Sequence, residues 1–351
     1  MIPVLQCLRG QWLWIAGAGF SRPRNDHMTD TGPLFVSSGN LIADRRYKWA
    51  LDHAARGDLT AAADILAQTV EQAPAFATAW FALGAIRDRL GDRSGAIAAF
   101  AQASGADPHD YHGARLQLAR LGAGEAAPAM SESYVRRLFD QYASRYDSAL
   151  TQHLAYRGPI LLREAVEQAM RTSDRPPHFA SMLDLGCGTG LAGEAFRKLV
   201  GRMVGVDLSS AMAAQAEAKH LYDRLVTADI TEFLLAAVKD GALFDLVIAA
   251  DVFVYVNDPA AIIAAAAAVL APGGVLAFTV ETDAGADVRL LPTLRYAHGE
   301  PYIRRALAAA GLVPASIAPA AVRTERGVPV EGLVVVALAS TRPPPPATSG
   351  G

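Results

Sequence analysis

The chain has 351 residues, of which 52% are hydrophobic, 7% aromatic and 19% charged. This length allows two ordinary domains, each with its own core, and excludes a single small module. Thirty-two basic and thirty-five acidic residues leave a net charge of -3, which argues against nucleic acid as a partner. The two cysteines, Cys7 and Cys187, exclude a disulfide framework and a cysteine-based zinc site, so we predict no metal site and a cytoplasmic setting.

Residues 1–20 weakly resemble a secretory signal, with Arg9 before a short apolar patch at residues 12–18. No apolar run reaches the roughly 18 residues of a spanning helix, so we expect no membrane association. The longest run, residues 260–271, lies between two prolines. We expect residues 1–42 to be a disordered leader with Met28 as the native start, and the proline-rich residues 341–351 to be a disordered tail.

A 34-residue repeat occupies the first third of the chain. Its first copy carries Gly57, Ala62, Leu66 and Pro74, and its second copy carries Gly91, Ala96, Phe100 and Pro108. Small residues at Gly84 and Ala96 allow two antiparallel helices to approach, with Trp80 and Phe100 between them. We therefore predict helical hairpins with a capping helix over residues 43–121, followed by a linker over residues 122–131.

The segment that carries the hairpin pattern resembles the tetratricopeptide family. This resemblance covers residues 43–110 and implies either a scaffold that packs on the rest of the chain or a groove for a peptide or protein partner.

The chemistry-bearing part begins at Met182, where an apolar strand, a glycine-rich turn and a helical pattern follow one another. Gly188, Gly190 and Gly193 satisfy the dinucleotide pattern, and Asp207 ends the next predicted strand. However, a carboxylate at Asp184 precedes the first glycine of the turn by two positions. It would repel a pyrophosphate but suits the ammonium of an amino-acid moiety.

The run DLGCGTG, with VDLS after the next strand, resembles the first two motifs of class I S-adenosylmethionine-dependent methyltransferases. The resemblance implies S-adenosyl-L-methionine as cofactor, a ribose contact at Asp207 and an adenine contact at Asp229 and Ile230. The complete predicted cofactor set is Tyr134, Tyr146, Asp184, Gly186, Cys187, Gly188, Gly190, Asp207, Leu208, Asp229, Ile230 and Ala250. The two tyrosines come from a segment that is similar to the helix covering the cofactor in ubiquinone- and biotin-pathway methyltransferases.

Later segments agree with a parallel sheet. FDLVIAADVFVYV, at residues 244–256, predicts a buried fourth strand, and an alanine-rich helix leads to a fifth strand, VLAFTVE. Two final strands end the domain. The predicted fold is α/β, a Rossmann-like seven-stranded class I methyltransferase sheet over residues 132–340, preceded by an all-α tetratricopeptide-like array. The whole chain thus resembles predicted bacterial tetratricopeptide-containing methyltransferases.

Methyl transfer needs alignment more than a covalent nucleophile, and a base only where the acceptor loses a proton early. The candidates for such a base are His153, Asp251 and His298, and structural roles are the simpler explanation for the two histidines. We expect an enzyme that methylates a small molecule or a protein. The alternatives are a tetratricopeptide interaction protein that binds the cofactor without catalysis and an NAD-dependent oxidoreductase.

Overall fold

The computed structural model describes residues 35–125, 129–147, 156–283, 285, 287–325 and 327–341. These ranges do not include the expected start at Met28, most of the leader, or His153. Of the tail, they include only its first residue. The chain divides into two compact units, residues 1–134 with 292–294 and residues 135–291 with 295–351. The predicted linker, residues 122–131, lies shortly before this boundary.

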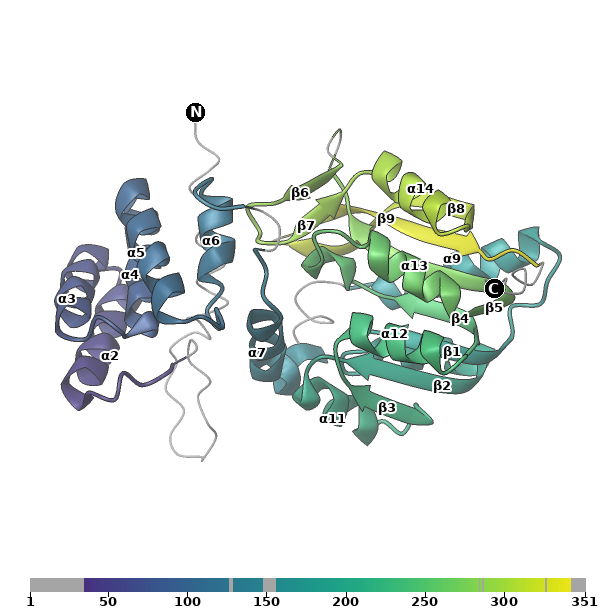
Figure 1. Cartoon of the computed structure of the whole chain (residues 1–351), viewed down its shortest axis with the longest axis horizontal. Helices are drawn as coiled ribbons and strands as arrows, with labels where there is room; N and C mark the ends of the chain where they lie inside the picture. Colours follow the sequence, from purple (N-terminus) through teal and green to yellow (C-terminus); the bar gives the residue numbers. More distant parts are fainter. Residues whose placement is uncertain are drawn as a thin grey trace, which may run out of the picture. The chain divides into compact units, whose positions relative to one another are not determined.

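The first unit consists of helical hairpins (Figure 1). Its helices are α2 (Leu41–Ala55), α3 (Leu59–Gln72), α4 (Ala77–Leu90), α5 (Arg93–Ala106) and α6 (Ala114–Arg120). Side-chain oxygens of Asn40, Asp58 and Asp92 cap the first turns of α2, α3 and α5, because they accept hydrogen bonds from free backbone N–H groups. The predicted hairpin array with a short final helix is present.

Small residues set the distance between α4 and α5. A Cβ added to Gly84 would lie 2.8 Å from the Phe100 ring, so this position excludes a side chain. Ala96 and Phe100 are buried, whereas Trp80 is half-buried and donates its indole N–H to the Pro74 carbonyl over 2.8 Å. The helix approach predicted at Gly84 and Ala96 is therefore confirmed.

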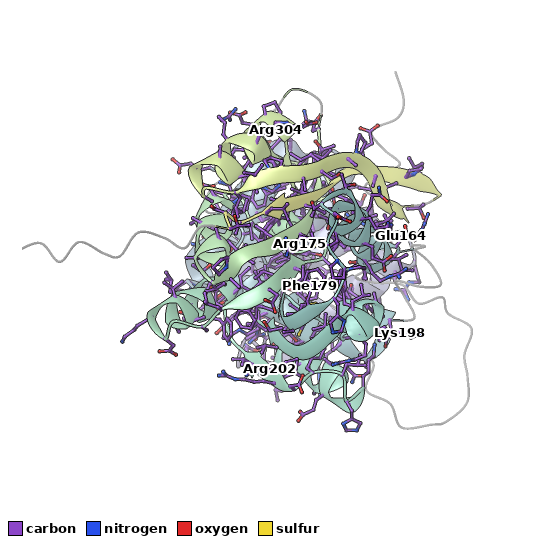
Figure 2. The ribbon with its side chains drawn as sticks, turned by 90° about the vertical axis from the view of Figure 1, so that its right-hand side faces the viewer. Glu164, Arg175, Phe179, Lys198, Arg202 and Arg304 are labelled. Carbon is purple, nitrogen blue, oxygen red and sulfur yellow. The ribbon has the colours of Figure 1, made fainter. Side chains whose placement is uncertain are left out.

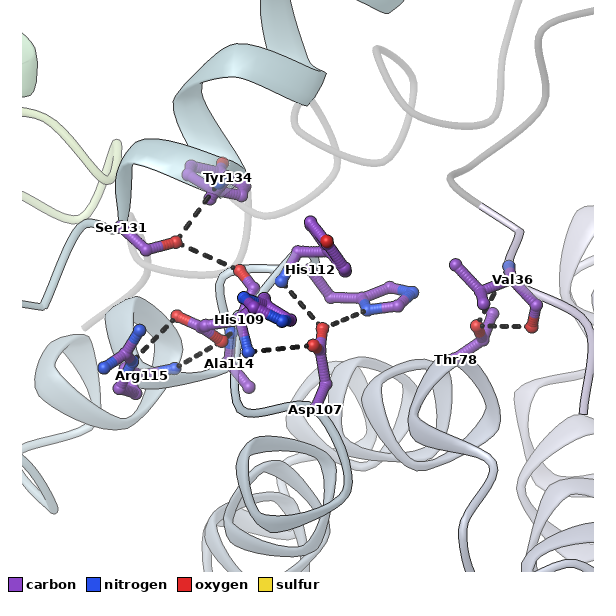
Figure 3. Close-up of polar contacts among 11 residues, drawn as sticks. Val36, Thr78, Asp107, His109, His112, Ala114, Arg115, Ser131 and Tyr134 are labelled. Carbon is purple, nitrogen blue, oxygen red and sulfur yellow. Dashed lines mark hydrogen bonds and ion pairs between the residues drawn. The ribbon is translucent and has the colours of Figure 1, made fainter. Parts of the chain in front are cut away.

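A polar network ends the helical unit (Figure 3). Asp110 is buried in the left-handed backbone region, and its carboxylate accepts a hydrogen bond of 2.6 Å from the Ala114 N–H at the start of α6. Its carbonyl accepts a hydrogen bond from Ser131 Oγ, which in turn accepts one from the Tyr134 N–H. These bonds attach the chain entering the next helix to the base of α6.

The second unit contains a mixed sheet. Its strands are β1 (Phe179–Leu185), β2 (Val200–Asp207), β3 (Arg224–Thr227), β4 (Phe244–Ala249), β5 (Leu270–Glu281), β6 (Val288–Leu290), β7 (Tyr296–His298), β8 (Val313–Glu325) and β9 (Val328–Leu338). The first five pair in parallel in the order β3-β2-β1-β4-β5, and β9 lies antiparallel between β5 and β8.

The predicted number of seven strands was wrong, because the described residues form nine. The short pair β6 and β7 extends the sheet from the last residue of β5, where Glu281 pairs with Ala297. Three-residue strands are too short to give a periodic pattern, and the sequence between them reads as a loop. The other seven strands match the seven segments that the sequence predicts as strands.

Helices cover both faces of the sheet. One apolar core joins it to α12 (Ile230–Lys239), α13 (Ala260–Ala268) and α14 (Glu300–Ala309). The other joins it to α9 (Gly158–Thr172) and α10 (Leu191–Phe196). The remaining helical segments are α7 (Glu132–Tyr142), η1 (Ala143–Arg145), η2 (Arg197–Leu199), α11 (Ser210–Ala218) and η3 (Phe253–Tyr255). Strands that are covered on both faces explain the near-continuous apolar runs.

The two edges of the parallel sheet differ in what they present. Figure 2 shows the edge where the strands begin, with Phe179 at the start of β1 and Arg175 beside it. Arg175 donates a hydrogen bond of 2.8 Å to the Gly273 carbonyl, which fixes it to the start of β5. The carboxyl ends of β1, β2 and β4 meet at the opposite edge, where open α/β sheets bind ligands.

The predicted fourth strand is shorter than expected. β4 ends at Ala249, and Asp251 has a φ of 60°, in the left-handed region. The chain then forms the 3-10 turn η3, because it must leave the sheet at the ligand edge before entering α13. Aspartate tolerates this backbone better than most residues.

Within the described ranges, no helix has the length and apolar character needed to cross a membrane.

Candidate active site

A glycine-rich turn joins β1 to α10. Gly186 has a φ of 65°, and a Cβ there would lie 2.6 Å from Cγ2 of Val252, so the turn packs directly against the loop after β4. The Cys187 N–H donates to the Val206 carbonyl over 3.0 Å and ties the turn to β2. Burial raises the pKa of the Cys187 thiol, which therefore stays protonated and is a poor nucleophile.

Asp207 ends β2 and faces this turn. One carboxylate oxygen accepts a hydrogen bond from the Gly188 N–H and the other accepts one from the Ser209 N–H, both of 2.8 Å. Burial raises the pKa of Asp207, while the two N–H donors oppose that effect. These two bonds hold the carboxylate in one orientation. Leu208, which follows it, is half-buried.

Asp184 is fully buried near the end of β1. The Tyr222 hydroxyl donates a hydrogen bond of 2.6 Å to Oδ2, whereas Oδ1 has no hydrogen-bond partner within the described part of the chain. Burial raises the pKa of Asp184 to about 7. A buried carboxylate oxygen without a donor is costly, and a ligand cation that supplied one would relieve the cost.

The last turn of α7 and the residues that follow it are bonded to the glycine turn and its neighbours. Ser209 Oγ donates a hydrogen bond of 2.5 Å to Asp140, and the Thr189 hydroxyl donates to Asp147. Lys219 forms ion pairs with Asp147 at 2.8 Å and with Glu194 at 2.9 Å. These contacts attach both ends of residues 140–147 to the glycine turn and the helices that follow β1 and β2.

Aromatic side chains line the space under this cover. The Tyr146 ring would lie 4.0 Å from a Cβ on Gly188, and Phe139 contacts the rings of Tyr146 and Tyr255 edge-on. Burial raises the pKa of Tyr146, Tyr156 and Tyr255, and the charge of Asp251 adds to the effect in all three. These three hydroxyls therefore stay protonated near Asp251.

An arginine-centred cluster lies beside the tyrosines. Arg323 on β8 is 1% exposed, and one guanidinium nitrogen lies 2.8 Å and 3.0 Å from the two oxygens of Asp251. Its other terminal nitrogen pairs with Glu281 at the end of β5, and Arg295 lies 3.6 Å from the same carboxylate. The Asp251 N–H also donates to Thr279 Oγ1 over 2.8 Å. We call Asp251, Glu281, Arg295 and Arg323 the ionic cluster.

The predicted adenine-side residues lie at the start of α12. The Asp229 carboxylate accepts hydrogen bonds from the Thr231 and Glu232 N–H groups and caps this helix. Ile230 packs on the apolar core, and Ala250 is half-buried after β4. An adenine contact at Asp229 remains a prediction, because the hydrogen bonds to Asp229 Oδ1 form a helix cap with or without a ligand.

The two remaining candidates are Tyr134 and His298. Tyr134 belongs to the helical unit, where a Cβ on Gly113 would lie 2.8 Å from its ring. His298 on β7 is fully buried, and its Nε2 lies 2.9 Å from the Val256 carbonyl. Burial lowers the pKa of His298, so it is neutral and serves to connect β7 to the segment after η3.

Sequence reasoning missed several polar residues of this edge. They are Asp140, Asp147, Tyr156, Lys219, Tyr222, Tyr255, Glu281, Arg295 and Arg323. Asp140 and Asp147 carried a signal in the F-D…Y-D pattern of residues 139–147, and Arg323 carried one as an arginine within an apolar strand pattern. A buried arginine requires a partner, but the sequence does not say which carboxylate supplies it.

Comparisons with known proteins agree with the geometry of the turn. Residues 183–278 match the family model described as "Methyltransferase domain". Human methyltransferase-like protein 27 is 35% identical over 105 residues, which are 30% of this chain and 40% of that protein. The chain thus aligns with well under two thirds of this relative.

Solved structures with a similar backbone include two methyltransferases. Magnesium protoporphyrin IX methyltransferase from Synechocystis PCC 6803, with bound SAH, has a TM-score of 0.44 at 19% identity, covering 60% of this chain and 99% of that one. The 1,6-didemethyltoxoflavin-N1-methyltransferase of Burkholderia thailandensis has a TM-score of 0.46 at 23% identity, covering 61% and 91%. The domain match therefore carries the assignment: residues 183–278 form a class I S-adenosylmethionine-dependent methyltransferase domain.

Proposed function

We propose that the whole chain transfers a methyl group from S-adenosylmethionine to a small-molecule or protein acceptor. The observation that carries the proposal is the fully buried Oδ1 of Asp184 beside the glycine turn, which has no hydrogen-bond partner among the residues that the structure describes. A cationic amino group placed there would provide the donor that this oxygen lacks. An anionic pyrophosphate would instead face a buried carboxylate, which disfavours the oxidoreductase alternative.

We assign the residues at the turn to different parts of the cofactor. Gly186, Cys187, Gly188 and Gly190 bring the backbone close to the ligand, and Asp207 and Leu208 are suited to the ribose side. Asp229 and Ile230 are assigned to the adenine, and Ala250 to the methyl donor. Tyr146 lies over the turn, and the hydrogen bond and the ion pair of the adjacent Asp147 hold it there. We keep Tyr134 as a predicted contact only.

The bound cofactor supplies an electrophilic methyl group on a sulfonium centre. The protein's own contribution is to exclude water and to hold donor and acceptor in line. The segment 140–147 performs the first task, because it is fastened to Thr189, Ser209 and Lys219. Asp251 is the remaining candidate base among the described residues, and Arg323 fixes its carboxylate in place.

Titration calorimetry with S-adenosylhomocysteine tests the proposal. The protein is expected to bind this product and not NADH. Asp207→Ala should weaken binding by about 1.5 to 3 kcal/mol, the value of a hydrogen bond to a charged group. Asp240→Ala, an exposed residue at the end of α12, serves as the matched control and should bind normally. Binding of NADH in place of S-adenosylhomocysteine would show that the assignment is wrong.

We also propose that the helical hairpins of residues 43–121 are a tetratricopeptide-like array that binds a partner or packs within the protein. The support is the 34-residue repeat and the close approach of α4 and α5 at Gly84. Labelled methyl transfer into a cell lysate, with comparison of the protein and small-molecule fractions, distinguishes the two classes of acceptor. Label in a protein that copurifies with residues 35–125 would favour the partner role.

A further inference from the structure

Tyr222 lies in the short connection between α11 and β3, and its ring fills a space that three glycines leave open. A Cβ added to Gly190 would lie 3.2 Å from this ring, and one added to Gly205 would lie 3.0 Å from it. A Cβ added to Gly193 would lie 2.6 Å from the hydroxyl oxygen. Since non-bonded atoms do not approach a Cβ this closely, Gly193 excludes a side chain while the Tyr222 hydroxyl occupies this position.

The backbone on both sides of Tyr222 is bonded to neighbouring elements. The Leu221 carbonyl accepts a hydrogen bond of 3.1 Å from Arg197 in η2. The Asp223 N–H donates to the Met203 carbonyl on β2 over 2.9 Å, and the Asp223 carboxylate accepts a hydrogen bond of 2.7 Å from the Met203 N–H. The position of the Tyr222 ring is therefore set from both sides of the chain as well as by the glycines.

The Tyr222 hydroxyl connects two groups of the site. It donates a hydrogen bond of 2.6 Å to Asp184 Oδ2, and it accepts one from the Gly193 N–H in the first turn of α10. An N–H in the first turn of a helix has no acceptor within its own helix. Burial raises the pKa of Tyr222, and the charge of Asp184 adds to the effect, so the hydroxyl keeps the proton that it donates.

This hydrogen bond fixes the orientation of the Asp184 carboxylate. Within the described ranges, the Tyr222 hydroxyl is the one donor that contacts this side chain, and it occupies Oδ2. The other oxygen, Oδ1, is the one left for a donor on a ligand. Asp207 differs, because two backbone N–H groups orient its carboxylate. The orientation of Asp184 therefore depends on a single side chain.

We propose that Tyr222 is a positioning residue of the cofactor site, which orients Asp184 so that Oδ1 receives the amino group of S-adenosylmethionine. This inference rests on the proposed function. It also gives a role to Gly193, the third glycine of the dinucleotide pattern in the sequence. In dinucleotide-binding turns the third glycine allows helix and strand to pack closely. Here it makes room for the Tyr222 hydroxyl, so the pattern is met for a different reason.

Tyr222→Phe tests the inference, because it keeps the ring among the three glycines and removes only the hydroxyl. Calorimetry compares two ligands. S-adenosylhomocysteine carries the amino-acid group, whereas 5′-deoxy-5′-methylthioadenosine has the same adenine and ribose without it. We expect the variant to bind S-adenosylhomocysteine about tenfold more weakly and to change the methylthioadenosine affinity less than about twofold. Retained methylthioadenosine binding also shows that the variant is folded.

The pH profile separates positioning from packing. Burial raises the pKa of Asp184 to about 7, the charge of Asp207 adds to this, and the hydrogen bond from Tyr222 opposes both. The nearby Cys187 thiol is protonated and adds no charge. Without the hydroxyl the pKa of Asp184 rises, so the loss of S-adenosylhomocysteine affinity on acidification begins at a higher pH. A tyrosine that only filled space would leave this profile unchanged when phenylalanine replaces it.

Two matched controls accompany these measurements. Tyr302 on α14 also donates a hydrogen bond from its hydroxyl to a carboxylate, that of Asp258, and Tyr302→Phe should keep the wild-type affinity for both ligands. Gly193→Ala should reproduce the selective loss, because its Cβ would displace the Tyr222 hydroxyl. Gly105→Ala alters a glycine of helix α5 that has nothing within 4 Å, and this variant should bind normally.

A selective loss of S-adenosylhomocysteine affinity with a shifted pH profile would support the inference. An equal loss for both ligands, or no loss for either, would overturn it and leave the proposed function standing. A selective loss with an unshifted profile would show that the hydroxyl does not act through Asp184, and would also contradict the inference. Failure of the wild-type protein to bind S-adenosylhomocysteine would overturn the proposed function as well.

Discussion

The glycine turn and the ionic cluster lie at the same edge of one sheet but are built in different ways. The turn is local: residues 184–190 form it, and the end of the neighbouring strand β2 orients it through backbone N–H groups. The cluster joins four side chains, from β8, from the end of β5, from the loop after β4 and from Arg295 just before β7. Motif reasoning reaches the first kind of site and not the second.

Strand pairing explains how the cluster forms. Gly332 on β9 pairs with Glu281 on β5 and with Ala320 on β8, which brings Arg323 within reach of Glu281 across the intervening strand. The left-handed turn at Asp251 then directs the chain toward the same point. We therefore expect the two regions to respond differently to substitution. Changes in the ionic cluster should lower the free energy of unfolding, and changes in the turn should lower ligand affinity.

The largest expected effect is on the cluster. Arg323→Met leaves the Asp251 carboxylate without its guanidinium and leaves Glu281 with Arg295 alone, and breaking a buried ion pair in this way costs about 3 to 5 kcal/mol of unfolding free energy. Urea denaturation measures this loss of unfolding free energy. Arg304→Met removes an exposed arginine that pairs with Glu300 and should cost less than about 0.5 kcal/mol. Equal losses in the two variants would show that the cluster is not structural.

A smaller effect is expected at the turn. Gly186→Ala adds a clash with Val252 to a left-handed backbone, and should cost about 2 to 3 kcal/mol of stability and at least about tenfold in S-adenosylhomocysteine affinity. Gly241 has the same φ of 65° with nothing within 4 Å, so Gly241→Ala isolates the backbone strain. Adding Val252→Ala to Gly186→Ala should restore part of the loss. Equal losses of stability and affinity in Gly186→Ala and Gly241→Ala would show that the clash with Val252 has no effect.

The smallest effect concerns pH. The ligand ammonium requires ionised Asp184, whose pKa burial raises from 3.8 to about 7, so affinity should fall by up to about tenfold per pH unit below neutrality. In the free protein the sign reverses: the folded state binds the extra proton, so this group lowers stability as pH rises from about 4 to 7. Asp184→Asn should flatten both dependences. Calorimetry and denaturation across this range measure them.

Much of the fold followed from patterns in the chain. The hairpins at residues 43–121, the glycine turn and the two terminal strands were predictable because each has a period or a motif of its own. Helix α9, the pair β6 and β7 and the true end of β4 were not predicted. β6 and β7 are too short for a periodic signal, and the apolar residues after Ala249 look the same in a strand or a turn.

The sequence by itself determined the class of the catalytic domain and which residues form the turn, because these depend on backbone geometry that glycine and aspartate specify locally. Tertiary structure alone decided which carboxylates meet Arg323 and that, among the described residues, Asp184 Oδ1 has no donor. Such contacts join residues up to 72 positions apart. The physical reason is that burial and pairing, which set charge and orientation, exist only once the strands lie side by side.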